Sequence, residues 1–332
     1  YGFFACSQYG DSYNNIRGTA TLARYNVTFN ANGGKVNGSD STTITAISTK
    51  TYSGVPSTAT RAGYDFAGWY TDPVGGTRTD IVNGATVNIN HDTTVYAHWI
   101  PRNDTRYTVK HWKQNIYDNT NQTVTNEYNT HYDSNHYTLA GTDTLTGTTA
   151  SSVTPNVNTY EGFPSPTRQS LTIAADGSSV LNYYYKRNAY NVSLTAGNGI
   201  QTVAGARNYL YGASVTIKAT MKPGYNWNKW EGNTINGSAS SCTFAMPSHN
   251  VTETAYGTPI TYNLNYLSND PDPTTSKAVM ATTPTTYNIE TENFTLNNPT
   301  RVGYDFIGWT TDGVTTPITP MTINKGSIGN NL

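Results

Sequence analysis

The chain has 332 residues, of which 12% are charged, and its formal net charge is −1 at pH 7. The length favours two to four domains, and the weak, scattered charge excludes a nucleic-acid-binding surface, which needs clustered Lys and Arg. No apolar run approaches the roughly 20 residues that a membrane-spanning helix needs, so we expect no membrane insertion in this segment. The 26 Tyr, 8 Phe, 6 Trp, 29 Gly and 15 Pro favour a folded, mainly β protein with frequent turns.

Residues 1–24 are predicted to form a β-hairpin, because YGFFACSQY, GDSYNN and IRGTATLAR read as strand, turn and strand. The hairpin resembles the last two strands of an immunoglobulin-like domain whose remainder would lie upstream. Tyr1 begins without a secretion signal, so we expect the chain to be cut from a longer precursor. The only cysteines, Cys6 and Cys242, are too few for a disulfide framework, and we expect them to stay unbonded.

A repeated aromatic motif organises the rest of the chain. Residues 61–72 read RAGYDFAGWYTD and residues 301–312 read RVGYDFIGWTTD, with nine of these twelve positions identical. A third copy, PGYNWNKWEG, occupies residues 223–232, and TYEGF at 159–163 is a fainter fourth. Each copy follows a strand-like segment that begins at a tyrosine: Tyr25, Tyr107, Tyr190 and Tyr262. This repetition predicts tandem small modules, each with its own core, in an extended string.

Short breaks between strand-like segments set the predicted boundaries. The segments are the hairpin at 1–24 and four modules at 25–100, 101–187, 188–257 and 258–332. In the last module LSNDPDPTT (267–275) replaces an Asn-Gly-Gly turn, and SIGNNL (327–332) stands where the closing strand should begin. We therefore expect the last module to lack its final strand, which leaves a sheet edge open to another chain.

These motifs support a family resemblance. Residues 25–100 and 260–332 resemble the Listeria–Bacteroides repeat, also called the internalin-type B repeat, through FNANGGKVNG, R-x-G-Y-x-F-x-G-W and YAHW. Residues 190–256 resemble its divergent form through TAGNG and GYNWNKWEG, and residues 106–187 resemble a mucin-binding-protein-like module through YTVKHW and IAADGSSVLNYYYKR. The resemblance implies a β-grasp-like fold with one short helix or helical turn. It also implies a spacer or adhesion role in wall-anchored or secreted proteins of Gram-positive bacteria.

The motif itself is interpreted as structural. A module of about 75 residues has marginal core volume, so burying one Tyr, one Phe and one Trp compensates for its size. The motif glycines are expected where the backbone turns tightly or passes close to a ring. We expect Trp69, Trp230 and Trp309 to be buried at equivalent positions. The motif residues are Arg61, Gly63, Tyr64, Phe66, Gly68, Trp69, Tyr225, Trp230, Arg301, Gly303, Tyr304, Phe306, Gly308 and Trp309.

Catalytic and metal-binding patterns are weak, so we expect no enzyme activity, cofactor or metal. His131 and His136 are interpreted as loop residues rather than ligands, and Asn269-Asp270-Pro271-Asp272 as a rigid turn rather than a calcium site. The candidate glycosidase carboxylates fall in different modules: Glu161, Glu231, Glu290 and Glu292.

Two features of residues 101–187 indicate a function other than a purely structural one. Tyr183, Tyr184 and Tyr185 occupy both faces of one strand, so at least one ring is expected to reach solvent and to suit sugar or protein recognition. Lys110 on the first strand and Asn182 on the last are candidates for an isopeptide bond, which surface adhesins can carry and which needs a buried carboxyl group nearby.

The sequence therefore favours a non-enzymatic stalk or adhesion segment that projects or assembles a bacterial surface protein, cell wall-associated or secreted. The alternative is a binding module, at 106–187, that contacts host ligands through exposed aromatic faces. The expected partners are a host glycan or protein, or other copies of the same surface protein, and no nucleic acid. The hypothesis of an enzyme would require that a part of the protein upstream of this chain carries the active site.

Overall fold

The computed structural model describes residues 18–116, 132–235, 237–268, 277–280 and 282–329. The chain divides by contacts into two compact units, and the boundary runs through strands of the segment 101–187. The first unit comprises Tyr1–Trp112, Leu139–Asn158 and Pro166–Tyr183, and the second comprises Lys113–Thr138, Thr159–Ser165 and Tyr184–Leu332. Below, the first to fourth modules denote residues 25–100, 101–187, 188–257 and 258–332.

The fold is mainly β, as predicted, and the described residues form strands and no helix. The short helix or helical turn implied by the resemblance is therefore wrong for these residues. In the first module the segment 48–63, between two strands, contains turns and isolated bridges instead. Gly54, Pro56 and Gly63 interrupt this segment, and Gly54 and Gly63 have positive φ, which a helix does not allow. Most of the hairpin predicted at 1–24, with Cys6, lies outside the described residues.

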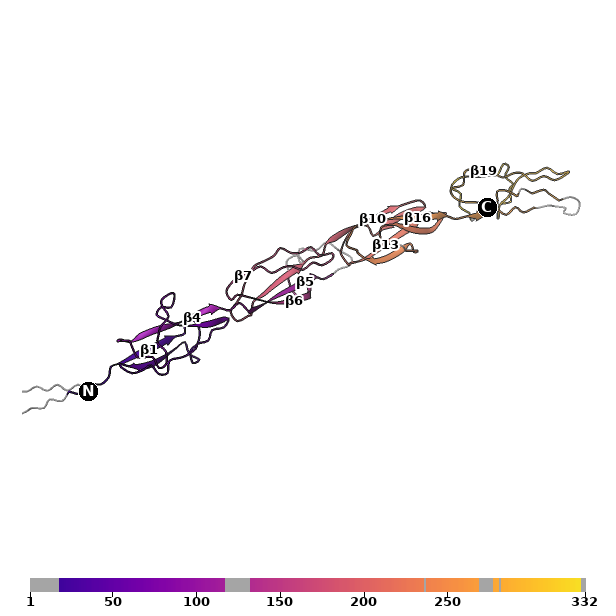
Figure 1. The fold of residues 1–332 in the computed structure, drawn as a ribbon. Helices are drawn as coiled ribbons and strands as arrows, with labels where there is room; N and C mark the ends of the chain where they lie inside the picture. The colour runs from indigo at the N-terminus through magenta and orange to yellow at the C-terminus, as the bar shows by residue number, and fades with distance from the viewer. Residues whose placement is uncertain (1–17, 117–131, 236, 269–276, 281, 330–332) are drawn as a thin grey trace, which may run out of the picture. The chain divides into compact units, whose positions relative to one another are not determined.

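The first module is a four-stranded sheet of order β2-β1-β4-β3. Figure 1 labels β1 and β4 of this sheet. Its strands are β1 (Arg24–Asn30), β2 (Ser41–Ile47), β3 (Tyr64–Tyr70) and β4 (Thr93–Pro101). β4 is one of the two inner strands and lies parallel to β1 and antiparallel to β3. Alternation along β1 and β4 directs Val27, Phe29, Val95 and Ala97 into the core, where each is at most 1% exposed.

The second module holds a three-stranded sheet of order β6-β5-β9 and a short ladder between β7 and β8. Its strands are β5 (Thr105–Gln114), β6 (Tyr137–Gly147), β7 (Ser152–Val153), β8 (Leu171–Thr172) and β9 (Val180–Tyr185). Alternation along β9 buries Tyr183 and Tyr185 completely and leaves Tyr184 half-buried on the opposite face. The expectation that one of the three rings reaches solvent is thus met by Tyr184.

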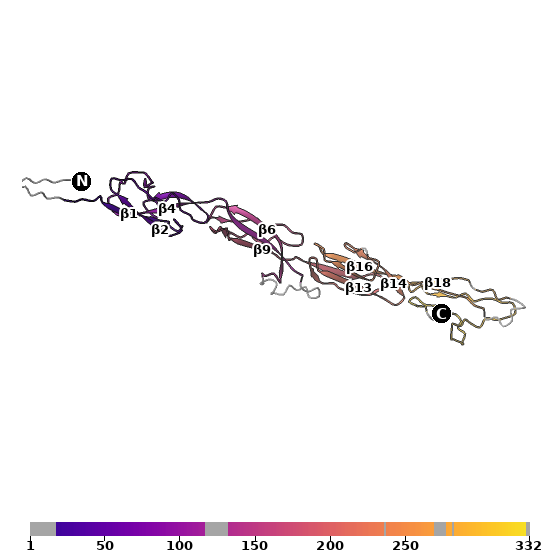
Figure 2. The same cartoon turned by 90° about the horizontal axis from the view of Figure 1, so that it is seen from below.

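The third module repeats the topology of the first, with a sheet of order β12-β10-β16-β14 and a second sheet of order β11-β13-β15. Figure 2 shows β14 alongside β16. The strands are β10 (Ala189–Ala196), β11 (Ile200–Ala204), β12 (Asn208–Leu210), β13 (Ser214–Met221), β14 (Tyr225–Gly232), β15 (Ser241–Ala245) and β16 (Val251–Pro259). Like β4 in the first module, β16 is an inner strand, parallel to one neighbour and antiparallel to the other.

The fourth module has shorter ladders in the residues that the structure describes. β17 (Tyr262–Asn263) pairs with β18 (Thr286–Tyr287), and β19 (Phe294–Thr295) pairs with β20 (Thr322–Ile323). Its cluster of buried residues consists of Tyr287, Leu296, Trp309 and Ile323, far smaller than those of the first and third modules.

Candidate functional site

A β-bulge determines the face of the sheet on which the tryptophan of the aromatic motif lies. In the first module the pairing of β3 with β4 shifts register between Phe66 and Gly68. The extra residue places Phe66 and Trp69, three positions apart, against each other, with ring centroids 5.2 Å apart. Strict alternation along a strand would have put these two side chains on opposite faces.

The other two copies keep the contact between the two aromatic rings. In the third module the register shifts between Trp227 and Lys229, and the rings of Trp227 and Trp230 are 5.5 Å apart. In the fourth module the rings of Phe306 and Trp309 are 5.4 Å apart. The aromatic pair at positions i and i+3 is therefore a common feature of the three motifs.

The three motif tryptophans lie in the cores, as expected. Trp69, Trp230 and Trp309 are 6%, 4% and 9% exposed. The indole N–H of Trp69 donates to the carbonyl oxygen of Pro56 at 2.8 Å. The indole N–H groups of Trp230 and Trp309 are buried without a partner among the described residues.

The motif tyrosines are not core residues, which corrects the expectation that a Tyr is buried with the Phe and the Trp. Tyr64 is half-buried and Tyr304 is 50% exposed. Both lie under an arginine, with the guanidinium carbon of Arg61 4.4 Å and that of Arg301 3.9 Å from the ring centroid. The reason in the first module is position, because Tyr64 is the first residue of β3, opposite Pro101 at the end of the sheet.

The nearest neighbour of the second motif glycine is an arginine side chain in the first module and a backbone segment in the fourth, whereas the prediction was a tight turn or a close approach to a ring. Gly68 and Gly308 have φ of 134° and 144°. A Cβ atom on Gly308 would lie 2.8 Å from the backbone nitrogen of Ile318, and one on Gly68 would lie 2.8 Å from Nε of Arg78. Neither position has room for a side chain without movement of its neighbour.

The first glycine of the motif forms a joint with the segment that follows the module. The carbonyl oxygen of Gly63 accepts hydrogen bonds from the backbone N–H of Arg102 at 2.9 Å and from Oγ1 of Thr149 at 2.7 Å. A Cβ atom on Gly63 would lie 2.6 Å from the carbonyl oxygen of Ala175. Thr149 is buried and its hydroxyl also contacts that of Thr105 at 2.6 Å.

A second joint is centred on Gly162, in the fainter motif copy. Its carbonyl oxygen accepts a hydrogen bond from the backbone N–H of Asn188 at 2.8 Å, and an added Cβ would overlap the ring of Tyr211. The guanidinium of Arg187 lies 4.9 Å from the ring centroid of Phe163 and donates to the carbonyl oxygen of Tyr211 at 2.7 Å. Burial lowers the pKa of Arg187, which still remains a cation at neutral pH.

The third joint is centred on Gly224. Its carbonyl oxygen accepts a hydrogen bond from the backbone N–H of Ile260 at 2.9 Å. A Cβ atom on Gly224 would lie 2.7 Å from a methyl carbon of Ile328 and 2.9 Å from one of Ile289. In all three joints a glycine that precedes an aromatic residue accepts from the chain just after a closing strand, and its Cα packs against the next module.

A carboxylate reinforces the third joint. Oε1 of Glu290 accepts hydrogen bonds from Nδ2 of Asn198 at 2.6 Å and from the hydroxyl of Tyr225 at 2.9 Å. These bonds, that of Asn198 first, lower the pKa of Glu290 below its usual 4.5. Since protonation weakens both bonds, the stabilisation from Glu290 is present above its unfolded-state pKa and is lost as the pH falls through the folded-state value.

The joint at Glu290 is therefore expected to be acid-sensitive. On lowering the pH from 7 to 3, the melting temperature of the parent chain should fall further than that of Glu290→Gln, because the amide oxygen accepts the same bonds at both pH values. Thermal unfolding followed by circular dichroism measures the difference. Glu231→Gln, which changes a solvated carboxylate paired with Lys229, is the control and should behave like the parent. Equal acid sensitivity of the parent and Glu290→Gln would contradict the assignment.

The first joint predicts a difference between two glycines of the same module. Gly63 and Gly38 both have positive φ, 71° and 79°, but a Cβ on Gly38 meets nothing within 4 Å. Gly38→Ala should cost about 1 kcal/mol through backbone strain alone. Gly63→Ala should cost about 1–3 kcal/mol more, because it also forces Ala175 and Thr149 away. Urea unfolding of the two variants measures this, and equal losses would show that Gly63 forms no joint.

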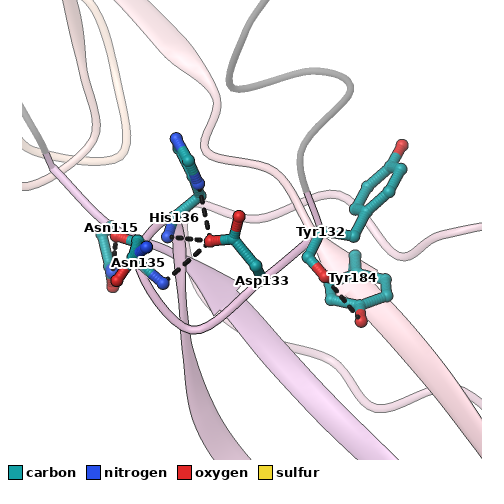
Figure 3. A network of polar contacts seen from close by, with 6 residues as sticks. All are labelled: Asn115, Tyr132, Asp133, Asn135, His136 and Tyr184. Carbon is teal, nitrogen blue, oxygen red and sulfur yellow. Dashed lines mark hydrogen bonds and ion pairs between the residues drawn. The ribbon is translucent and has the colours of Figure 1, made fainter.

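A tyrosine cluster in the second module combines tilted and edge-on ring contacts with polar groups, and Figure 3 shows Tyr132 and Tyr184 of this cluster. The ring centroid of Tyr184 lies 4.6 Å from that of Tyr132 and 5.0 Å from that of Tyr137. Tyr132 is 48% exposed, while Tyr137 is fully buried beneath it. Burial, helped by the two neighbouring tyrosines, raises the pKa of Tyr137 to about 12.

A turn beside the cluster supplies charge and amides (Figure 3). Oδ1 of Asp133 accepts from the backbone N–H groups of Asn135 and His136 and lies 2.7 Å from Nδ1 of His136. The hydrogen bond with His136, more than the backbone bonds, lowers the pKa of Asp133. Nδ2 of Asn115 donates to the carbonyl oxygen of Asn135 at 3.1 Å. The arrangement offers a flat ring for stacking and fixed polar groups beside it.

The candidate isopeptide pair lies on neighbouring strands. Trp112, on β5, donates its indole N–H to Oδ1 of Asn182, on β9, at 2.9 Å. Lys110 is two positions from Trp112 and therefore lies on the same face of β5. Because Trp112 contacts Asn182 on that face, Lys110 shares a face of the sheet with Asn182. The isopeptide bond also needs a buried carboxyl group near the pair. Among the described residues the fully buried acid is Glu253, which lies in the third module and not on this face. The isopeptide bond stays a prediction.

His131, Cys6 and Asn269-Asp270-Pro271-Asp272 lie outside the described residues. Cys242 is a free thiol whose Sγ lies 3.2 Å from the carbonyl oxygen of Ala239. Glu161, Glu231 and Glu292 contact Ser248, Lys229 and Lys325, respectively. Within the described ranges no His, Cys, Asp or Glu side chains cluster with metal-binding geometry. The same ranges contain no helix long and apolar enough to span a membrane.

Glu253 is a residue that the sequence analysis missed. Its side chain is fully buried, and Oε1 accepts the backbone N–H groups of Thr234 and Ile235, each at 2.9 Å. Oε2 is buried without a partner among the described residues. Alternation in Val251-Thr-Glu-Thr-Ala255 places Glu253 on the same face as two buried apolar residues, a signal that could have identified it.

Three segments of the chain match known families of repeat domains. Residues 25–98 and 262–329 match the Listeria-Bacteroides repeat domain. Residues 190–260 match the divergent InlB B-repeat domain. A search of curated proteins found no match to this chain. The resemblance of residues 106–187 to a mucin-binding-protein-like module stays a prediction.

Proposed function

Because three segments of the chain are repeats of the Listeria–Bacteroides and divergent InlB B types, we propose that it is a non-enzymatic spacer of a bacterial surface protein. In this role the chain holds a functional region of the longer protein away from the cell wall. Modules of this size are stabilised by their own small cores, so that adding or removing one changes the length of the spacer and little else.

The observation that carries the proposal is the repeated glycine joint. Domains connected only by an exposed linker move freely relative to each other, which wastes the reach of a spacer. Here each joint adds packing and hydrogen bonds to the linker, at Gly63, Gly162 and Gly224. Those contacts restrict bending within each unit, and restricted bending is what projection requires.

The proposal is tested by measuring height above a surface. The chain is anchored through its C-terminal end to a supported bilayer and carries a fluorophore at its N-terminal end, and metal-induced energy transfer reports the height of the fluorophore. Deleting residues 188–257 should lower the mean height by one step and keep its distribution narrow. A broad height distribution that deletion hardly shifts would contradict a spacer.

The tyrosine cluster favours a second candidate function, direct binding of a host glycan or protein. The half-exposed ring of Tyr132 lies over Tyr184 and close to the Asp133 turn, and the ammonium of Lys186 lies 5.9 Å from the Tyr132 ring centroid. Sugar rings stack on such surfaces while amides and charges contact their hydroxyls. Binding on a glycan array that Tyr132→Ala abolishes, and that Tyr304→Ala leaves intact, would support this role over that of a pure spacer.

A further inference from the structure

The first joint contains an open cleft of about 360 Å³. Its walls come from the turn at residues 33–35, from residues 60–62 just before the motif glycine, and from Ala175 of the second module. Sites for small molecules in proteins begin at about 300 Å³ and often lie where two folded units meet. The cleft is therefore large enough for a small organic molecule.

Arg61 supplies a fixed positive charge to this cleft. Its side chain is half-buried, and its guanidinium carbon lies 4.4 Å from the centroid of the Tyr64 ring. A Cβ atom added to Gly33 would lie 3.5 Å from the same carbon. A guanidinium carries several N–H donors, yet Arg61 has no hydrogen-bond acceptor and no acid partner among the described residues. The ring and the turn thus position the cation while its donors stay available.

The second joint shows how an internal partner satisfies such a cation. Arg187 lies over the ring of Phe163, as Arg61 lies over that of Tyr64. Nε of Arg187 donates to the carbonyl oxygen of Gln114 at 2.7 Å, and Nη1 donates to that of Tyr211 at 2.7 Å. Arg61 has the same kind of aromatic support but lacks the acceptors.

The third joint shows where a carboxylate docks. The registers of β1 with β4 and of β10 with β16 align Gly33 with Asn198, and the motif aligns Tyr64 with Tyr225. Asn198 and Tyr225 both donate to the carboxylate of Glu290. At the first joint the two corresponding residues lie beside Arg61 instead of an acid. The polar group of the first joint is therefore a cation that lacks its anion.

The acids on the segments that meet at the first joint have other partners or face away. Three carboxylates each accept a hydrogen bond from a neighbour: Asp40 from Lys35, Asp104 from Arg102 and Asp176 from Ser178. Asp65 follows Tyr64 along β3, so alternation directs it to the opposite face of the strand from the ring beneath Arg61. Direct contact with these acids therefore does not neutralise Arg61.

We propose that the cleft of the first joint binds the carboxylate of a small acidic ligand from outside the chain. Two N–H groups of Arg61 donate to the two carboxylate oxygens, because the planar guanidinium fork matches this geometry. The rest of the ligand, an acidic sugar or an acidic amino acid, lies against the turn at 33–35 and Ala175. The external carboxylate then has the role in the first joint that Glu290 has in the third.

The test titrates the full chain with sodium D-glucuronate, with N-acetyl-L-glutamate α-amide and, as the uncharged match of the first probe, with D-glucose. Saturation-transfer NMR should show saturable binding of an acid with a Kd on the order of 1 mM, and no binding of glucose. The acid with the lower Kd identifies the source of the carboxylate, and equal values mean that the carboxylate alone is recognised. Absence of saturable binding for both acids would overturn the proposal, as would equal binding of glucose.

Four substitutions locate the binding in the cleft. Arg61→Gln should raise the Kd about tenfold or more, since it removes charged hydrogen bonds, and Arg61→Lys should raise it less because the charge remains. Arg78→Gln changes an exposed arginine of the first module that does not line the cleft, so it should leave the Kd unchanged. Ala175→Glu adds a competing carboxylate to the lining and should also weaken binding, which keeps the test decisive if Arg61→Gln fails to fold. A Kd that neither Arg61→Gln nor Ala175→Glu changes would overturn the assignment.

Discussion

Trp69→Ala is expected to lower the free energy of unfolding of the first module by about 3–5 kcal/mol, most of the stability of so small a unit. The indole is 6% exposed, and its ring lies edge-on to Phe29 at 5.0 Å and to Phe66 at 5.2 Å. Its removal leaves a cavity in the centre of a core that cannot collapse around it without moving β4. Urea unfolding measures the loss. It is monitored by far-ultraviolet circular dichroism rather than by tryptophan fluorescence, which the substitution itself changes.

Two conservative variants separate packing from hydrogen bonding. Trp69→Phe keeps ring contacts but leaves the carbonyl oxygen of Pro56 without its donor, so it should cost about 1–3 kcal/mol. Trp230→Phe should cost less, because the indole N–H of Trp230 has no partner among the described residues. If Trp69→Ala unfolds at the same urea concentration as the parent, the assignment of Trp69 to the core is mistaken.

Glu253→Ala is expected to lower the stability of the third module by about 2–4 kcal/mol. The substitution leaves the N–H groups of Thr234 and Ile235 without their shared acceptor, and each such loss costs about 1–3 kcal/mol. Glu253→Gln should cost much less, since the amide oxygen accepts the same two backbone bonds. Thermal unfolding of the two variants measures the contrast.

The matching control is a surface acid of the same module. Glu231 pairs with Lys229 at 3.0 Å, and its side chain is 61% exposed. Glu231→Ala should therefore change stability by less than about 0.5–1 kcal/mol. A loss for Glu253→Ala no greater than for Glu231→Ala would show that the buried carboxylate is dispensable.

The sequence predicted the mainly β fold and the burial of the motif tryptophans, because repetition and alternation depend on local patterns. It did not predict the bulge between Phe66 and Gly68. The alternation rule assumes a constant register, whereas a bulge changes the face of every later residue. The tyrosine of the motif was misplaced for a related reason, since burial depends on how far the sheet extends beyond Tyr64, where β4 ends at Pro101.

The joints and the tyrosine cluster were beyond the reach of local patterns. Thr149 binds the carbonyl oxygen of Gly63 from 86 positions away in the chain, and no periodicity links the two. The sequence predicted that one unspecified ring of Tyr183, Tyr184 and Tyr185 reaches solvent, but Tyr132 and Tyr137, which contact Tyr184, come from a different segment. A glycine before an aromatic residue recurs at 63, 162, 224 and 303, and this was the one signal that pointed to the joints.

We infer that the glycine joints hold neighbouring segments of each unit in a fixed orientation. The most direct measurement is the distribution of distances between two spin labels across the first joint, by double electron–electron resonance. Labels are placed at Val74→Cys and Thr167→Cys, two exposed positions of the first unit, with Cys6 and Cys242 replaced by Ser. We predict one narrow distribution in the parent, broadened by Gly63→Val and left narrow by Gly38→Val. A broad distribution in the parent, unchanged by Gly63→Val, would contradict the claim.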